Sequence, residues 1–414
     1  MFELNRVYNC DCITAMREIP ENTIDDIVTD PPYGLKFMGK GWDHGIPGIP
    51  FWQEALRVCK PGAHMLAFGG TRTHHRLMVA IEDAGWEIRD TLMWVYGSGF
   101  PKSLDVSKAI DKAAGVEREV IGRIEPLGRE GRKSPMRGFG GSEFDYGGGY
   151  LDDNLKTITA PATDAAKQWQ GYGTALKPAW EPVILCRKPL EGTVAENVQK
   201  WGTGAINIDG CRIPVDPKVD DMLRTTTRGK RITETWENGS GFKNENNLLT
   251  GVPEKGRFPA NLIHDGSDEV LALFPDTQPS KCKYVRKTGD EQFLGVMGDG
   301  RTNDPDGLND CGSAARFFYC AKASKAERNW GLPKGMTNKH PTVKPLSLTG
   351  YLIRLISRED SLVLDPFLGS GTTGIACARG GRRFLGFEIE EESFITADLR
   401  VRKAQEQGKI SEWF

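Results

Sequence analysis

The sequence predicts an α/β protein of the Rossmann-like, doubly wound class, built on a mostly parallel sheet. Two observations support this class. Short apolar strands alternate with helical patterns near both ends of the chain, and a glycine-rich turn joins one of these strands to a helix. The chain has 414 residues. This length indicates two domains or one large domain with an insertion, since domains contain about 100–200 residues.

The N-terminal part of the chain contains predicted strands at residues 6–10, 24–29 and 64–68. After the first strand, apolar residues from Ile13 to Ile19 recur at helical spacing until Pro20 ends the pattern. A second helix is predicted over residues 51–59. Strands that are separated by helices in this way are typical of a parallel sheet.

The C-terminal part repeats this alternation. Helices are predicted at residues 346–357, 374–379 and from about 391, and strands at 361–364 and 383–388. Pro345 stands just before the first of these helices, where its missing N–H group is not needed. A tight turn at residues 369–373 joins the first of these strands to the following helix.

The middle of the chain has a different composition. It includes a glycine-rich stretch at residues 137–150 and, at residues 224–231, the most basic run of the sequence. We therefore predict one α/β domain that is split over residues 1–115 and 316–414. Residues 116–315 are predicted to form a loop-rich insertion.

Charge and composition exclude several protein classes. The 54 basic and 56 acidic side chains give a net charge of −2, which neither requires nor excludes a nucleic-acid partner. No apolar run approaches the ~20 residues that cross a bilayer, and the first residues do not resemble a signal peptide. We therefore expect a cytoplasmic protein without membrane contact. The nine cysteines lack the spacing of a zinc site, so no metal is predicted.

The glycine-rich turn has the pattern G-x-G-x-x-G from Gly369 through Gly371 to Gly374, and Glu388 ends the next predicted strand. Without Cβ atoms, glycines let the backbone approach a nucleoside closely, and a carboxylate in that position can accept both ribose hydroxyls. The pattern therefore indicates a nucleoside site. By itself it does not distinguish NAD from another adenosine ligand.

A second motif, Asp30-Pro31-Pro32-Tyr33, follows the predicted strand that ends at Thr29. The prolines fix the backbone and remove two N–H donors, which leaves the Asp30 carboxylate and the Pro31 carbonyl as acceptors. Two adjacent acceptors suit an exocyclic amine, and the Tyr33 ring offers a face for a planar base. The alternative is an ordinary turn at the end of a strand.

Together, these motifs resemble those of the DNA amino-methyltransferases, which transfer a methyl group from S-adenosylmethionine to N6 of adenine or N4 of cytosine. Residues 362–373 resemble the cofactor loop of that family, and residues 338–345 resemble the segment that meets the methionine end. The catalytic motif precedes the cofactor motif, which is the permuted order of the β class. The middle of the chain resembles phage and prophage methyltransferases more loosely, at residues 177–182, 202–210 and 317–322.

The resemblance implies a circularly permuted, seven-stranded methyltransferase sheet with an inserted target-recognition region. It implies that Asp30 and the Pro31 carbonyl, in the turn completed by Pro32, bind the target amine, and that Tyr33 stacks on a flipped-out base. The cofactor-binding residues that it implies are Asp11, His340, Thr342, Lys344, Asp365, Phe367, Gly369, Ser370, Gly371, Thr372, Thr373 and Glu388.

Within this set, the resemblance places Phe367 beside the adenine of the cofactor and Glu388 on its ribose. Thr342, Lys344 and the backbone of Thr372 and Thr373 are expected to face the methionine carboxylate. For Asp11 two interpretations stay open: contact with the cofactor adenine or the target strand, or an N-cap of the helix that follows it.

A duplex substrate requires base flipping, because a stacked base cannot enter such a pocket. We expect the insertion to contact DNA, with phosphates bound by Arg224, Arg228, Lys230 and Arg231. The alternative for this cluster is a solvated loop whose charges are balanced by nearby acidic residues. The resemblance implies double-stranded DNA as the partner, and a homodimer or a cognate restriction endonuclease are further candidates.

Asp30 at the first position of the tetrapeptide favours adenine N6 as the target, since cytosine-N4 members of the family more often carry Ser there. Cytosine N4 is the close alternative. An RNA or protein N-methyltransferase and a DNA-binding protein without activity are more distant alternatives. An NAD-dependent enzyme would leave the turn at residues 30–33 unexplained. We expect a bacterial or phage-encoded enzyme that works in the cytoplasm.

Overall fold

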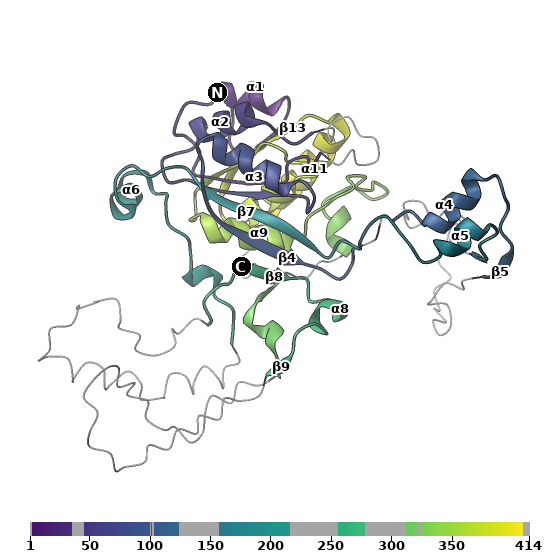
Figure 1. Cartoon of the computed structure of the whole chain (residues 1–414). Coiled ribbons are helices and arrows are strands. Elements are labelled where there is room, and N and C mark those ends of the chain that lie inside the picture. The colour runs from purple at the N-terminus through teal and green to yellow at the C-terminus, as the bar shows by residue number, and fades with distance from the viewer. Residues whose placement is uncertain are drawn as a thin grey trace, which may run out of the picture. The chain divides into compact units, whose positions relative to one another are not determined.

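The computed structural model describes residues 2–34, 45–99, 101, 103–123, 157–215, 256–277, 312–321 and 325–408 (Figure 1). The chain forms two compact units. The main unit comprises Met1–Ser98 and Ala179–Phe414, and the smaller unit comprises Gly99–Pro178.

In the described part of the main unit, a nine-stranded sheet forms the centre. The strands, in spatial order, are β1 (Arg6–Asn9), β13 (Arg383–Glu388), β12 (Leu362–Asp365), β2 (Asp26–Thr29), β3 (His64–Phe68), β7 (Trp180–Arg187), β4 (Glu87–Val95), β8 (Leu262–His264) and β11 (Tyr319–Cys320). Neighbours pair in parallel, except that β7 is antiparallel to both β3 and β4. The predicted α/β class with a mostly parallel sheet is confirmed.

The number of strands differs from the seven that were predicted. The first seven strands in this order run from β1 to β4, and five of them were predicted from the sequence, whereas β7 and β4 were not. Strands β8 and β11 extend the sheet at one edge. These two strands contain three and two residues, so they are too short to produce a recognisable alternation of apolar and polar residues.

The two ends of the chain meet at the centre of this sheet. Val363 and Leu364 of β12 pair with Asp26 and Ile27 of β2, so the purple N-terminal and yellow C-terminal segments interleave (Figure 1). The strand order runs outward in both directions from this pair, which makes it a topological switch point. Open α/β sheets bind their ligands at the carboxyl ends of strands beside such a point.

Helices cover both faces of the sheet. One apolar cluster includes residues of α1 (Cys12–Arg17), α2 (Ile49–Val58) and α3 (His74–Asp83), and the other includes residues of α9 (Leu346–Ile356), α10 (Thr372–Arg379) and α11 (Glu391–Gln407). Successive strand residues alternate between the clusters: Ile27 belongs to the first and Val28 to the second. The sheet is therefore doubly wound.

The range predicted to be an insertion, residues 116–315, is divided differently in the structure. Its strands β7 and β8 belong to the main sheet, and α6 (Val194–Trp201) follows β7 with a capping box formed by Thr193 and Glu196. The compact unit that separates from the main one is Gly99–Pro178. Residues 183–186 of β7 form an apolar run whose side chains alternate between the two apolar clusters, as in a strand buried on both faces.

The remaining short elements of the main unit lie in the segments that connect the strands and helices named above. They are η4 (Asp209–Cys211), α8 (Asp268–Leu271), η6 (Ala314–Phe317), η7 (Lys325–Asn329) and the antiparallel pair β9 (Asp276–Thr277) and β10 (Gly312–Ser313).

The smaller unit contains α4 (Val106–Ala113), the antiparallel pair β5 (Val120–Arg123) and β6 (Thr157–Thr159), and α5 (Asp164–Gln168). The buried Asp111 connects its parts. Its carboxylate accepts hydrogen bonds from the backbone of Ala162 and from the backbone and hydroxyl of Thr163, all at 2.8–3.0 Å, and pairs with Arg118 at 3.4 Å.

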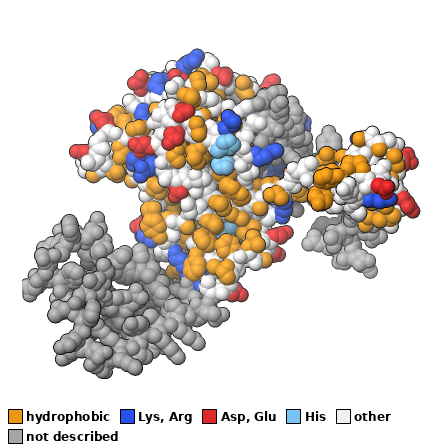
Figure 2. Space-filling model, in the orientation of Figure 1, with side chains coloured by type: hydrophobic (Ala, Val, Ile, Leu, Met, Phe, Trp, Pro, Cys, Tyr) orange, Lys and Arg blue, Asp and Glu red, His pale blue; other side chains and the backbone are white. Residues whose placement is uncertain are grey.

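The surface agrees with the near-zero net charge. Acidic and basic side chains are interspersed over the visible face of the main unit (Figure 2). Every helix within the described ranges is too short or too polar to span a bilayer. In the same ranges, no three His, Cys, Asp or Glu side chains are grouped as ligands of a metal ion.

Candidate active site

A cavity of about 320 Å³ opens at the edge of the sheet where β1, β2, β3, β12 and β13 end. This volume is in the range of ligand pockets. Of the residues predicted for catalysis or cofactor binding, all except Gly371 line the cavity. The sheet explains this convergence, because parallel strands present their carboxyl ends at one edge.

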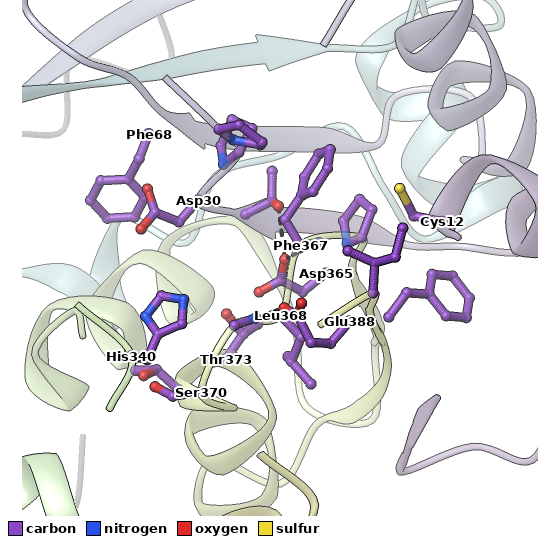
Figure 3. A pocket seen from close by; sticks show the side chains of 18 of the residues that line it. Cys12, Asp30, Phe68, His340, Asp365, Phe367, Leu368, Ser370, Thr373 and Glu388 are labelled. Carbon is purple, nitrogen blue, oxygen red and sulfur yellow. Dashed lines mark hydrogen bonds between the residues drawn. The ribbon is translucent and has the colours of Figure 1, made fainter. Parts of the chain in front are cut away.

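One part of the cavity is built by the turn between β12 and α10. Asp365, the last residue of β12, is buried, and its Oδ1 accepts hydrogen bonds from the Thr29 hydroxyl at 2.7 Å and the Phe367 backbone at 3.1 Å. Burial raises the pKa of Asp365 to about 6. In the view of Figure 3, Asp365 lies between Asp30 and Glu388.

The two glycines of this turn have different tasks. Gly369 has φ of 57°, and a Cβ atom at this position would lie only 3.1 Å from the His340 Nε2. The absence of a side chain therefore lets the backbone pass close to His340. Gly371, with φ of 86°, instead allows α10 to pack on α11, because a Cβ atom there would lie 3.0 Å from the Cα of Ala397. Gly371 therefore serves helix packing and lies outside the cavity lining.

Glu388 ends β13 and faces the same cavity (Figure 3). Its Oε2 accepts a hydrogen bond from the Gly369 backbone and its Oε1 one from the Glu390 backbone, both at 2.8 Å. Burial raises the pKa of Glu388 to about 7. The backbone bonds fix the carboxylate, and its remaining lone pairs can accept hydroxyl donors such as those of a ribose.

Aromatic and polar groups complete this end of the cavity. The Phe367 ring packs on Phe51 of α2, with 4.8 Å between ring centroids, and offers an apolar wall. Thr372 and Thr373 open α10, whose first backbone N–H groups have no partner within the helix. Helix N-termini with free N–H groups attract anionic groups.

Of the two interpretations of Asp11, the structure shows the N-cap, and contact with the cofactor adenine or the target strand stays a prediction. Asp11 is the N-cap of α1, where its Oδ1 accepts hydrogen bonds from the Thr14 backbone at 2.9 Å and the Thr14 hydroxyl at 2.8 Å. It also lines the cavity, together with its neighbours Cys10 and Cys12.

The other part of the cavity is built by the turn after β2. Asp30 follows the last residue of that strand, and the Tyr33 hydroxyl donates a hydrogen bond to Asp30 Oδ1 at 2.7 Å. Burial, followed by the charges of Asp30 and Glu181, raises the pKa of Tyr33. The Tyr33 hydroxyl is thus a stable donor, which holds Asp30 in one orientation.

Lys344 lines the cavity, but its ammonium is directed at the turn after β2 and not, as expected, toward the site for the methionine carboxylate at the start of α10. Its Nζ lies 2.7 Å from Asp30 Oδ2 and 3.2 Å from both the Tyr33 hydroxyl and Glu181 Oε2. It also lies 4.8 Å from the Phe68 ring centroid, a favourable cation–π position. Burial disfavours its charge, but the carboxylates of Asp30 and Glu181 outweigh burial and raise the pKa of Lys344.

Sequence reasoning missed three residues near this turn: Phe68, which lines the cavity, and Glu181 and Tyr96, which are connected to it through Tyr33 and Lys344. Glu181 Oε2 lies 3.2 Å from the Tyr33 hydroxyl, and Glu181 Oε1 accepts a hydrogen bond from the Tyr96 hydroxyl at 3.3 Å. Because β7 is antiparallel to its neighbours, its first residues lie at the edge where the other strands end. Residues 177–182 carry no local signal for this position, because the direction of a strand in a sheet is not encoded by its neighbouring residues.

Four predicted residues cannot be placed. Arg224, Arg228, Lys230 and Arg231, the predicted phosphate contacts, lie outside the residues that the structure describes. Their role remains a prediction.

The chemistry of the cavity is asymmetric. One end carries a fixed carboxylate, an aromatic wall and a helix N-terminus, which together suit a nucleoside that carries an anionic tail. The other end carries acceptors on Asp30 beside the Tyr33 ring, which suit a planar group with an amine. The arrangement can therefore hold two ligands with their reactive atoms close together.

Comparison with known proteins agrees with this description. A family model described as DNA methylase matches residues 24–398. The type II methyltransferase M2.LlaDCHI of Lactococcus lactis subsp. cremoris is 33% identical over 97 residues, which cover 23% of this chain and 34% of that protein. M2.DpnII of Streptococcus pneumoniae is 36% identical over 99 residues, which cover 24% and 34%. The chain thus matches about a third of the length of these two relatives.

One relative matches over most of its length. The type II methyltransferase M.HindIII of Haemophilus influenzae is 21% identical over 426 residues, covering 92% of this chain and 90% of that protein. Among solved structures, the M1.HpyAVI–SAM complex has 15% identity and a TM-score of 0.39, covering 96% of this chain and 98% of its own. The PvuII DNA methyltransferase, titled cytosine-N4-specific, has 12% identity and a TM-score of 0.42, covering 95% and 85%.

Proposed function

Because this chain belongs to the N6/N4 DNA methylase family, we propose that it methylates the exocyclic amine of a base in double-stranded DNA, with S-adenosylmethionine as the methyl donor. The observation that carries this proposal is the shared cavity. The turn from Asp30 to Tyr33 and the site around Glu388 open into the same space, so an amine and a nucleoside cofactor can meet there.

The residues present fit S-adenosylmethionine. Glu388 has a fixed carboxylate for the ribose hydroxyls, and Phe367 provides a wall for the adenine. The N-terminus of α10 at Thr372 and Thr373 can receive the methionine carboxylate. When bound, S-adenosylmethionine supplies a methyl group on a positively charged sulfur, which needs no further activation.

The chain's own contribution to transfer is alignment and charge. Asp30, with the Pro31 carbonyl, accepts the N–H bonds of the amine and thereby directs the nitrogen lone pair toward the donor. The Asp30 charge also favours the positive charge that develops on this nitrogen. Tyr33 keeps Asp30 in place through the 2.7 Å hydrogen bond and presents its ring to the flipped base.

For the target atom we favour adenine N6, with cytosine N4 as the alternative. The support is the Asp at the first position of the tetrapeptide, where cytosine-N4 relatives more often carry Ser. An RNA or protein substrate is disfavoured because the catalytic motif precedes the cofactor motif. A silent DNA-binding role is disfavoured because the residues of both motifs are intact.

Three further expectations belong to this proposal. The segment that contains Arg224 and Lys230 contacts DNA phosphates. A homodimer and a cognate restriction endonuclease are candidate partners, and the curated relatives M2.LlaDCHI and M.HindIII are named as type II methyltransferases. A bacterial cytoplasm, with a bacterial or phage gene, is the expected setting.

The test is to incubate the protein with isotopically labelled S-adenosylmethionine and unmethylated bacterial DNA, and to identify the labelled nucleoside by mass. Label on N6-methyladenosine is expected. Label on N4-methylcytidine would keep the reaction and change the base, and the absence of label would contradict the proposal.

The matched control is Asp30→Ala. Removal of the carboxylate should abolish methyl transfer, because the amine loses its main acceptor, while the cofactor affinity measured by calorimetry stays within a few-fold of wild type. Retained turnover in this variant would exclude Asp30 from the mechanism.

A further inference from the structure

The ammonium of Lys344 occupies the position that a target amine needs. Its Nζ lies 2.7 Å from Asp30 Oδ2, the ordinary distance of an N–H···O hydrogen bond. The Tyr33 hydroxyl already occupies Asp30 Oδ1. An amine that binds Asp30 would therefore share the carboxylate with Lys344, and the charged ammonium is the stronger of the two donors.

The charge of Lys344 makes this competition important for the reaction. Its side chain is only 9% exposed, so water screens its charge poorly. During transfer the amine itself becomes positively charged. If Lys344 remained paired with Asp30, its ammonium would repel the positive charge that develops on the amine. It would also neutralise the carboxylate that should stabilise this charge.

Glu181 provides a second partner for the ammonium. Its Oε2 lies 3.2 Å from Lys344 Nζ, and its Oε1 is held by the Tyr96 hydroxyl at 3.3 Å. The carboxylate comes from β7, a different strand from the one that carries Asp30. Lys344 can thus leave Asp30 Oδ2 and still keep an ion pair inside the cavity wall.

We propose that Glu181 is a positioning residue that takes over the Lys344 ammonium when the target amine reaches Asp30. The Lys344–Glu181 pair is then neutral, and the full charge of Asp30 acts on the amine. This inference rests on the proposed function, since it assumes that Asp30 binds the amine. It adds no chemical step, only a shift of one ammonium between two carboxylates.

The first test is Glu181→Gln, which keeps the shape of the side chain and removes its charge. At saturating cofactor we expect kcat to fall by about tenfold or more, the size of a coupling between neighbouring charges. The cofactor affinity, measured separately by calorimetry, should stay within a few-fold of wild type.

The decisive measurement is a double-mutant cycle with Lys344→Met. In the Glu181→Gln background this second substitution removes the unbalanced positive charge, so it should restore part of the lost kcat. A merely structural role of Glu181 predicts the opposite, because each substitution would remove further packing. A double variant that is slower than Glu181→Gln would overturn the proposal.

Two matched variants complete the design. Tyr96→Phe removes the hydrogen bond to Glu181 without changing any charge, and should reduce kcat less than Glu181→Gln does. Glu181→Asp keeps the charge and should retain more kcat than Glu181→Gln, which also tests the proposal if the glutamine variant unfolds. Equal losses in the Asp and Gln variants, or wild-type kcat in Glu181→Gln, would contradict it. Wild-type protein that transfers no methyl group would instead contradict the proposed function itself.

Discussion

Two carboxylates of the cavity differ from ordinary surface acids because burial disfavours their ionised forms. Burial raises the pKa of Asp365 to about 6 and that of Glu388 to about 7. Asp365 lines the cavity, and its Oδ1 accepts hydrogen bonds from the Thr29 hydroxyl and the Phe367 backbone. Glu388 faces the cavity, so its protonation should govern what the cavity binds.

The affinity for a ribose should therefore depend on pH around the pKa of Glu388. Only the ionised carboxylate accepts hydrogen bonds from both hydroxyls. Since the pKa of Glu388 is about 7, affinity should rise as pH increases through 7 and fall below it. Adenosine is the suitable probe, because it carries the ribose and no group that titrates between about pH 5 and 9.

Isothermal calorimetry at several pH values checks this prediction, with Glu388→Gln as the control. The variant should bind adenosine weakly and with little dependence on pH. A wild-type affinity that is constant across this range, or an equal dependence in the variant, would contradict the assignment of the ribose to Glu388.

At the scale of elements, the helix that begins at Thr372 is positioned by a close approach of two helices. Gly371 lies in the left-handed region and almost touches α11 at Ala397. The sequence predicted this helix from residue 374, whereas α10 begins two residues earlier. The N-cap of α10 is a glycine and forms no side-chain hydrogen bond. The sequence therefore lacks the polar N-cap residue from which the first residue of a helix is usually predicted.

Gly371→Ala should destabilise the protein by more than backbone strain alone. A non-glycine residue at this φ costs about 1–3 kcal/mol, and the contact with Ala397 should add about 1–3 kcal/mol of overpacking. Gly335→Ala is the matched control, since Gly335 has φ of 92° with no atom near a Cβ position. Urea unfolding compares the two variants, and equal losses of unfolding free energy would exclude a packing role for Gly371.

The turn between β3 and α3 is a second element of functional interest. It packs on the catalytic turn, because a Cβ atom on Gly70 would lie 3.1 Å from Tyr33 Cδ2. Arg72 and Arg76 are exposed in this segment, and neither forms an ion pair with any residue in the described ranges. Two exposed cations in the segment that follows Gly70 suit the phosphates that flank a flipped base.

Replacing Arg72 and Arg76 by Gln should weaken DNA binding and reduce its salt dependence. Each lost phosphate contact lowers the slope of log K against log salt by about 0.9. Fluorescence anisotropy with a DNA duplex at several salt concentrations measures both quantities. Arg89→Gln, at an exposed position on β4 paired with Glu87, is the control, and the same slope in all proteins would contradict the prediction.

At the scale of the whole molecule, the cavity depends on both ends of the chain. Asp30 comes from the N-terminal part and Asp365 and Glu388 come from the C-terminal part, and β2 and β12 are paired at the centre of the sheet. Each described residue that lines the cavity belongs to the main unit.

Cofactor binding should therefore slow amide hydrogen exchange in both the N-terminal and the C-terminal part of the main unit. At a cofactor concentration of 100 times Kd, binding stabilises the native state by about 2.7 kcal/mol, which slows globally controlled amide exchange about 100-fold. Hydrogen exchange followed by mass spectrometry should show this for β2, β12 and β13, and no change for α4.

Glu388→Gln at the same cofactor concentration is the control and should show little protection. Protection confined to the C-terminal half, or equal protection in α4, would contradict a site that is shared by the two ends of the main unit.

The sequence by itself determined the features that neighbouring residues encode. A strand, a glycine turn, a helix and a strand that ends in an acid follow each other directly from Leu362 to Glu388, and the prolines at 31 and 32 impose their own turn. Such motifs form from local backbone preferences. The resulting fold class is confirmed, and all the predicted cavity residues except Gly371 line one cavity.

The tertiary structure alone decided which distant residues meet. Glu181 reaches Tyr33 and Lys344 only because β7 enters the sheet antiparallel to its neighbours. Strands β8 and β11 join the sheet although each is too short to be recognised. The resemblance led us to expect Lys344 to face the methionine carboxylate, but its flexible side chain instead takes its place from the carboxylates of Asp30 and Glu181. Contacts of this kind depend on the order of the strands in the sheet and on the positions of distant charged side chains. Neither can be predicted from residues that are adjacent in the sequence.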